Sequence, residues 1–152
     1  MRALLQRVGH ASVSVDGDEV GSCAHGLLVL LGVGPDDDDA TARRLWRKVL
    51  ALRIFDDADG KTNLSLTDVG GEVLVVSQFT LYADCRRGNR PSFTGAGAAE
   101  DAERLYDLFC ELADEDVAHV GRGRFGADMR VSLVNEGPFT IWLDTDEMGG
   151  GR

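Results

Sequence analysis

The sequence predicts a mixed α/β fold, in which largely antiparallel β-sheets form a barrel-like core together with two main α-helices. Two segments place apolar residues at helical spacing, whereas many short segments alternate between apolar and polar residues or run continuously apolar. Turns of hairpin length join several of the short segments, which favours antiparallel pairing. The 152 residues suit a single domain, expected at residues 1–144, with a disordered C-terminal tail at 145–152.

The first part of the chain is predicted to be mostly strand. Residues 2–15 form the first strand, and 16–18 are a turn that leads into a short strand around Val20. Residues 27–33 are continuously apolar, as in a strand that is buried on both faces.

The first predicted helix begins at the aspartate block 36–39 and ends near Phe55. Acidic side chains can cap the free N–H groups of a helix start and interact favourably with its dipole. The block lacks the ligand spacing of a calcium loop, so a solvated helix start is the better interpretation. The second predicted helix spans 98–113. The apolar faces of the two helices are expected to carry Ala42, Leu45, Val49 and Leu52, and Ala102, Leu105, Phe109 and Leu112.

Further strands are predicted at 73–76, 117–120, 130–134 and 139–143. Residues 121–126 match the letters of a dinucleotide-binding glycine loop, but that motif requires a helix directly after it. A strand is predicted to follow, so we expect an ordinary loop and no dinucleotide.

The N-terminus lacks the pattern of a signal peptide, and no apolar run approaches the length of a membrane helix. We therefore expect a cytoplasmic protein without a membrane partner. The three cysteines are Cys23, Cys85 and Cys110, whose spacing suggests neither a disulfide framework nor a zinc site. We interpret them as small buried residues, with a nucleophilic role as the alternative. Neither a metal nor a cofactor is expected.

The net charge of −10 argues against DNA as a partner, because an acidic chain repels phosphate and lacks a basic footprint. A local RNA contact remains open beside the simpler interpretation of solvated loop charges, since arginine suits bidentate phosphate binding. The arginines of the second half gather at Arg86, Arg87 and Arg90, and at Arg122, Arg124 and Arg130.

Two polar segments are candidate sites. Ser77-Gln78-Phe79-Thr80 follows a buried strand and can offer hydroxyls, an amide and backbone N–H groups to a ligand, although a satisfied strand end is the simpler interpretation. Asn135 to Thr140 contains Gly137-Pro138 between two predicted strands, where an ordinary turn is the simpler interpretation. If the Gly-Pro bond is cis, its two carbonyls face the same side as a rigid pair.

At these two segments the chain resembles the D-aminoacyl-tRNA deacylase family of the bacterial and eukaryotic type, from Met1 to about Asp144. The matching stretches are 1–3, 6–8, 26–32, 52–55, 63–65, 75–83, 90–93, 123–129 and 135–140.

The resemblance implies a homodimer with active sites at the subunit interface, which acts on the aminoacylated 3′ end of tRNA. It implies hydrolysis of the ester of D-aminoacyl-tRNA, and of glycyl-tRNA mischarged on tRNA(Ala), with L-amino acids rejected by a Gly-cis-Pro gate. The implied catalytic segment is Ser77, Gln78, Phe79 and Thr80. The implied substrate-binding residues are Gly137 and Pro138, Arg7 as their holder, and Phe125, Gly126, Ala127 and Met129 beside the terminal adenosine. Glu136 and Phe139 depart from the aspartate and valine that most often flank the Gly-Pro dipeptide in the family.

Ester hydrolysis needs donors aimed at the developing oxyanion. Our hypothesis is that the backbone N–H groups of Phe79 and Thr80 supply them, and the resemblance favours participation of the ribose 2′-hydroxyl with water as the attacking species. The Thr80 hydroxyl as nucleophile is the alternative. Two other classes remain open: a non-catalytic module that binds RNA ends, and a small-molecule esterase that uses Cys85 or Ser77.

Overall fold

The computed structural model describes residues 1–149 and confirms the mixed α/β fold. A six-stranded sheet has the order β2-β1-β3-β6-β7, with β8 paired to β1, and a small second sheet is formed by β4 and β5. The helices are α1 (Asp39–Ala51), the short 3-10 helix η1 (Phe79–Tyr82) and α2 (Ala99–Asp116). The strands are β1 (Arg2–Val15), β2 (Asp18–Cys23), β3 (Gly26–Gly32), β4 (Phe55–Asp56), β5 (Thr62–Leu64), β6 (Glu72–Ser77), β7 (Val120–Arg122) and β8 (Arg130–Asp144).

The sheet curves into a nearly closed barrel. β1 pairs antiparallel with β2, β3 and β8, whereas β3, β6 and β7 run parallel to one another. β2 and β7 come close where Gly21 faces Gly121: a Cβ on Gly21 would lie 2.3 Å from the Arg122 carbonyl oxygen, and one on Gly121 would lie 2.3 Å from that of Ser22. Glycine at both positions therefore permits the approach that nearly closes the barrel.

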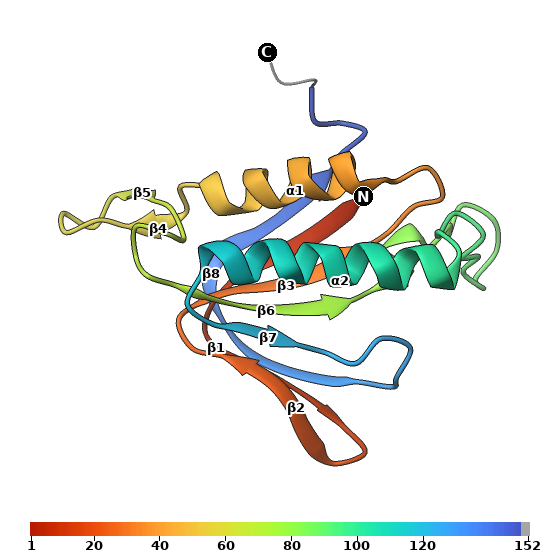
Figure 1. Cartoon of the computed structure of the whole chain (residues 1–152), viewed down its shortest axis with the longest axis horizontal. Coiled ribbons are helices and arrows are strands. Elements are labelled where there is room, and N and C mark those ends of the chain that lie inside the picture. Colours follow the sequence, from red (N-terminus) through yellow and green to blue (C-terminus); the bar gives the residue numbers. More distant parts are fainter. Residues whose placement is uncertain (150–152) are drawn as a thin grey trace.

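Two apolar clusters fill the fold. The larger one lies between the sheet and the helices, which run side by side across one face of the sheet (Figure 1). The Trp46 ring of α1 meets the Phe109 ring of α2 edge-on, with 5.4 Å between centroids. The smaller cluster joins β1, β2, β3 and β6 and includes Val8, Leu28 and Val76. β3 contributes alternate side chains to both clusters, which confirms that it is buried on both faces.

The helices begin near their predicted starts but end elsewhere. Asp38 caps α1, and its carboxylate accepts a 2.8 Å hydrogen bond from the Thr41 N–H. α1 stops at Ala51 rather than near Phe55, because Leu52 adopts an extended conformation and Phe55 pairs with Leu64 in the small sheet. α2 continues to Asp116, so β7 lies later than the predicted 117–120.

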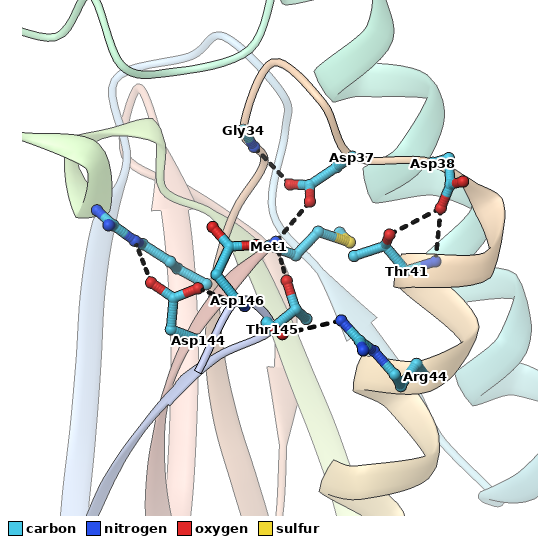
Figure 2. Close-up of polar contacts among 10 residues, drawn as sticks. Met1, Gly34, Asp37, Asp38, Thr41, Arg44, Asp144, Thr145 and Asp146 are labelled. Atoms are coloured by element: carbon cyan, nitrogen blue, oxygen red, sulfur yellow. Dashed lines mark hydrogen bonds and ion pairs between the residues drawn. The ribbon is translucent and has the colours of Figure 1, made fainter. Parts of the chain in front are cut away.

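Asp37 differs from its neighbours in the aspartate block, because its side chain is only 9% exposed. Its carboxylate accepts hydrogen bonds from the Met1 amino group at 2.6 Å and from the Gly34 N–H at 2.6 Å, as Figure 2 shows. The Met1 amino group also donates to the Thr145 hydroxyl. The interpretation of the whole block as a solvated helix start is therefore wrong at this position.

The ordered chain continues past the predicted boundary at Asp144. Thr145 is buried, and its N–H donates to the Met1 carbonyl at 2.9 Å. Its carbonyl accepts a 2.8 Å hydrogen bond from the Arg44 guanidinium (Figure 2). The expectation of disorder from residue 145 onward is wrong at this residue, because these bonds tie it to β1 and α1; for residues 150–152 it lies outside the described chain. No helix within residues 1–149 is long and apolar enough to cross a membrane.

Candidate functional site

A cavity of about 560 Å³ opens where β6 ends. One part of its wall comes from Ser77, Gln78 and Phe79, and another comes from 125–129, the segment that leads into β8. Tertiary folding therefore brings together two of the segments that sequence reasoning had selected separately. The remaining lining residues are Val33, Val76, Phe93, Ala96, Gly97, Ala99, Ala102 and Val131.

After β6 ends at Ser77, two backbone N–H groups have no hydrogen-bond acceptor among residues 1–149. The Gln78 N–H donates to the Leu31 carbonyl at 2.8 Å, which holds the segment against β3. The chain then turns into η1, and the N–H groups of Phe79 and Thr80 find no acceptor among residues 1–149. The Gln78 side-chain amide donates to the Thr80 hydroxyl. This hydrogen bond engages the Thr80 hydroxyl, and Thr80 is not among the residues that line the cavity.

The part of the cavity wall formed by 125–129 packs against α2. The Phe125 ring packs against the Tyr106 ring, with centroids 6.2 Å apart, and the Tyr106 hydroxyl donates to the Val75 carbonyl at 2.8 Å. Burial raises the pKa of Tyr106 well above its usual range, so this phenol stays a hydrogen-bond donor and not a base. Gly126 turns the chain at a φ of 75°, which L side chains rarely adopt.

Two exposed aromatic rings stand at the cavity. Phe79 is 56% exposed and Phe93 is 38% exposed, and the rings meet edge-on with 5.2 Å between centroids. Phe93 was not singled out from the sequence, although it ends one of the stretches that resemble the family. Exposed aromatic faces of this kind suit stacking on a nucleobase.

Gly137-Pro138 lies outside this cavity. β8 is continuous from Arg130 to Asp144, so the prediction of two strands joined by a turn is wrong. Gln6 pairs with Thr140 and Val8 with Asn135, so residues 136–139 bulge away opposite a single residue of β1. We call residues 136–139 the Gly-Pro bulge. Its Gly-Pro bond is cis, as the resemblance implied, and both residues of the dipeptide are exposed.

Asn135 closes the Gly-Pro bulge at its base. Its side-chain amide donates to the Arg7 carbonyl at 2.9 Å and to the Phe139 carbonyl at 3.1 Å. Sequence reasoning placed Asn135 in the segment but gave it no role. Its contacts depend on the register of β1 and β8, which no local pattern reveals.

Arg7 holds the same bulge from the other side and is itself only 8% exposed. Its Nε–H donates to the Glu136 carbonyl at 3.2 Å, and its Nη1–H donates to the Ile54 carbonyl at 2.9 Å. Its Cζ lies 4.5 Å from the centroid of the Phe139 ring. The guanidinium therefore fixes both ends of the bulge to a buried part of the fold.

The structure accommodates both departures from the family pattern. The bulk of Phe139 is used in stacking on Arg7. The Glu136 carboxylate lies between Arg7 Nε at 3.8 Å and His25 Nε2 at 3.7 Å, and its side chain extends over Gly9. A Cβ on Gly9 would lie 2.9 Å from a carboxylate oxygen of Glu136, so the glycine leaves room for the longer stem.

The cysteines do not belong to the cavity wall. Cys23 and Cys110 are buried, as interpreted from the sequence, but Cys85 is exposed and lines a separate open groove beside Arg2 and Tyr82. Burial raises the pKa of Cys23 to about 11 and that of Cys110 to about 12. Neither buried thiol is therefore a nucleophile at neutral pH.

Comparisons with known proteins identify the family. The model of the family described as D-Tyr-tRNA(Tyr) deacylase matches residues 4–144. Proteins named D-aminoacyl-tRNA deacylase from Aliivibrio fischeri (strain MJ11) and Escherichia coli O81 (strain ED1a) are each 56% identical over 143 residues, which cover 94% of this chain and 99% of the relative.

Two solved structures share the fold. One, titled c-Myc DNA Unwinding Element Binding Protein, is 39% identical with a TM-score of 0.89, over 95% of this chain and 98% of that one. Another, titled as a probable eukaryotic D-amino acid tRNA deacylase, is 21% identical with a TM-score of 0.79, over 93% and 97%. The family match over residues 4–144 and the identity to bacterial relatives show that this chain belongs to the D-Tyr-tRNA(Tyr) deacylase family.

Proposed function

We propose that this chain is a D-aminoacyl-tRNA deacylase, which hydrolyses the ester between a D-amino acid and the 3′ end of tRNA. The observation that carries the proposal is the meeting of Ser77 to Phe79 with 125–129 around one cavity, in a chain that belongs to this family. A cavity of about 560 Å³ is of the size that binds a small molecule or the end of a chain. The cytoplasm, where tRNA is charged, is the location that fits this substrate.

In the proposed reaction, the terminal adenosine lies along Phe125, Gly126, Ala127 and Met129, and the ester carbonyl points to the end of β6. The N–H group of Phe79, which lines the cavity, and that of Thr80, which directly follows it, have no acceptor among residues 1–149, and in this scheme they stabilise the oxyanion that forms when water attacks. The 2′-hydroxyl of the terminal ribose assists the attack. No side-chain nucleophile is required, which suits a cavity whose polar lining is a hydroxyl, an amide, one carboxylate and backbone groups.

The selection of chirality is proposed to come from a second copy of the chain. Gly137 and Pro138 are exposed and do not line the cavity of their own chain. In a homodimer, the partner subunit's Gly-Pro bulge would complete the cavity and leave no space for an L side chain. β8 also exposes Val134 (63%) and Trp142 (43%), apolar surface that a dimer would bury.

Exclusion by shape sets a limit on this selection. Glycine carries a hydrogen atom where an L-amino acid carries its side chain, so a steric gate cannot reject it. Glycyl-tRNA(Ala) is therefore included in the proposed substrates. If purified enzyme leaves glycyl-tRNA(Ala) intact under conditions that clear D-tyrosyl-tRNA, the gate recognises more than shape.

The decisive experiment compares D- and L-tyrosyl-tRNA as substrates of the purified protein. The proposal expects rapid hydrolysis of the D ester and survival of the L ester. Retained tRNA binding with neither ester cleaved would identify a module that binds RNA ends, and equal cleavage of simple tyrosine esters would identify an esterase. The dimer is tested by light scattering, where a particle with the mass of one chain contradicts it.

One relative's title names a DNA element, but we assign no DNA partner to this chain. The net charge of this chain is −10, which repels a DNA duplex, and duplex binding requires many phosphate contacts. A substrate held by its aminoacylated end needs few such contacts.

A further inference from the structure

A short hairpin follows the catalytic segment and carries three arginines. The backbones of Asp84 and Ser92 exchange two hydrogen bonds, from the Asp84 N–H at 2.7 Å and from the Ser92 N–H at 3.0 Å. The loop between them places Arg86, Arg87 and Arg90 on the surface, all exposed. We call residues 84–92 the arginine hairpin.

The three arginines are not equivalent. Arg86 is neutralised within the hairpin, because its Nε and Nη2 donate to the two carboxylate oxygens of Asp84 at 2.8 and 2.7 Å. These bonds hold the pKa of the Asp84 carboxyl well below its usual range, so the pair stays ionised. Arg87 and Arg90 make no ion pair or side-chain hydrogen bond with any of residues 1–149. Among residues 1–149 nothing occupies these two guanidinium groups, so both are open to an external anion on a chain whose net charge is −10.

The arginine hairpin adjoins the cavity. The residue after Ser92 is Phe93, which lines the cavity and packs edge-on against Phe79. Ala96 and Gly97 continue the same wall, and the Gly97 N–H donates to the Val33 carbonyl at 2.8 Å, which fastens the wall to the end of β3. The loop that carries Arg87 and Arg90 therefore leads directly into this part of the cavity wall.

We propose that Arg87 and Arg90 bind backbone phosphates of the RNA strand immediately 5′ of the aminoacylated nucleotide. The inference rests on the proposed function, since it requires the ester to lie in the cavity. Guanidinium groups form bidentate hydrogen bonds with phosphate oxygens, and two such contacts at the rim position the strand without a broad basic surface. Arg86 is not part of this contact, because Asp84 occupies the fork of its guanidinium.

The test compares two substrates. D-tyrosyl-tRNA carries the phosphates, whereas the 3′ ester of D-tyrosine with adenosine carries none. The double variant Arg87→Gln, Arg90→Gln is expected to raise KM for D-tyrosyl-tRNA about tenfold or more with kcat little changed. Hydrolysis of D-tyrosyl-adenosine should stay at the level of the original protein. The slope of log kcat/KM against log salt should become shallower by about 1.4 for two phosphates of a single strand.

Arg86→Gln is the matched control, because each such substitution removes one positive charge from the hairpin. It is expected to change KM and the salt slope much less than Arg87→Gln or Arg90→Gln does. Equal effects at all three positions would show a diffuse charge effect and overturn the proposal, as would an unchanged KM in the double variant. Slower hydrolysis of D-tyrosyl-adenosine by the double variant would overturn it too, since the arginines would then act on the cavity. If the original protein cleaves neither substrate, the proposed function itself fails.

Discussion

The guanidinium of Arg7 lies over the ring of Phe139, with 4.5 Å between its Cζ and the ring centroid. The same group donates to the Glu136 carbonyl and to the Ile54 carbonyl, so one buried side chain connects the Gly-Pro bulge to the chain segment after α1. The position of Gly137-Pro138 is thus set by a contact between residues far apart in the sequence.

Arg7→Lys is expected to weaken chiral discrimination. An ammonium group keeps the charge, but it cannot stack on Phe139 and donate to two carbonyls with fixed geometry. The ratio of kcat/KM for D- over L-tyrosyl-tRNA should fall by about tenfold or more. Arg44→Lys, which changes a residue that donates to the Thr145 carbonyl, is the control and should leave the ratio unchanged. An unaltered ratio in Arg7→Lys would contradict the role given to Arg7.

Phe139→Leu is expected to lower the free energy of unfolding without removing the gate. Leucine keeps an apolar contact with the core but removes the aromatic face under Arg7, a loss of about 0.5–1 kcal/mol. Chemical denaturation measures this change. A variant as stable as the original would mean that the Arg7–Phe139 contact contributes nothing measurable.

Thr80→Ala is expected to retain substantial turnover. The Thr80 hydroxyl is engaged by the Gln78 amide, and the backbone N–H that we assign to the oxyanion remains after the substitution. We expect kcat to fall by less than about tenfold. A substrate that ends in 2′-deoxyadenosine should instead lose hydrolysis. Near-complete loss of turnover in Thr80→Ala with binding retained would favour the hydroxyl as nucleophile.

Thiol titration should find one reactive cysteine per native chain. The thiolate is the reactive form, and burial raises the pKa of Cys23 to about 11 and of Cys110 to about 12, so both stay protonated at about pH 8. Cys85 is exposed and should react with a disulfide reagent at once. All three thiols should react in denaturant. Rapid reaction of a second thiol in the native protein would contradict the burial of Cys23 and Cys110.

Asp37→Asn is expected to destabilise the fold by about 3 kcal/mol, because it leaves the buried Met1 ammonium without its counter-charge. The neighbouring Asp38→Asn is the control. Asparagine caps a helix about as well as aspartate does, so that variant should unfold close to the original midpoint. Similar denaturation midpoints for the two variants would show that the Asp37 contact contributes little.

Much of the fold was predictable because it follows from patterns of residues that are close together in the sequence. The alternation over 11–15, the continuous apolar run that became β3 and the helical spacing in α1 each depend on side chains a few residues apart. The helix end at Ala51 and the late start of β7 were missed, because the extended backbone at Leu52 and the packing of the helices on the sheet decide them.

The candidate site was also predictable in part from the sequence and in part only from the tertiary structure. The sequence alone selected the candidate segments, Ser77 to Thr80, 125–129 and Gly137-Pro138, because their residue types resemble those of a family. Only the tertiary structure decided that the first two share a cavity while Gly137-Pro138 lies apart on a bulge held by Arg7. It also decided that Asp37 binds the Met1 ammonium while its neighbour Asp38 caps α1. These relationships depend on strand register and on contacts between distant residues, which a local pattern of residue types does not specify.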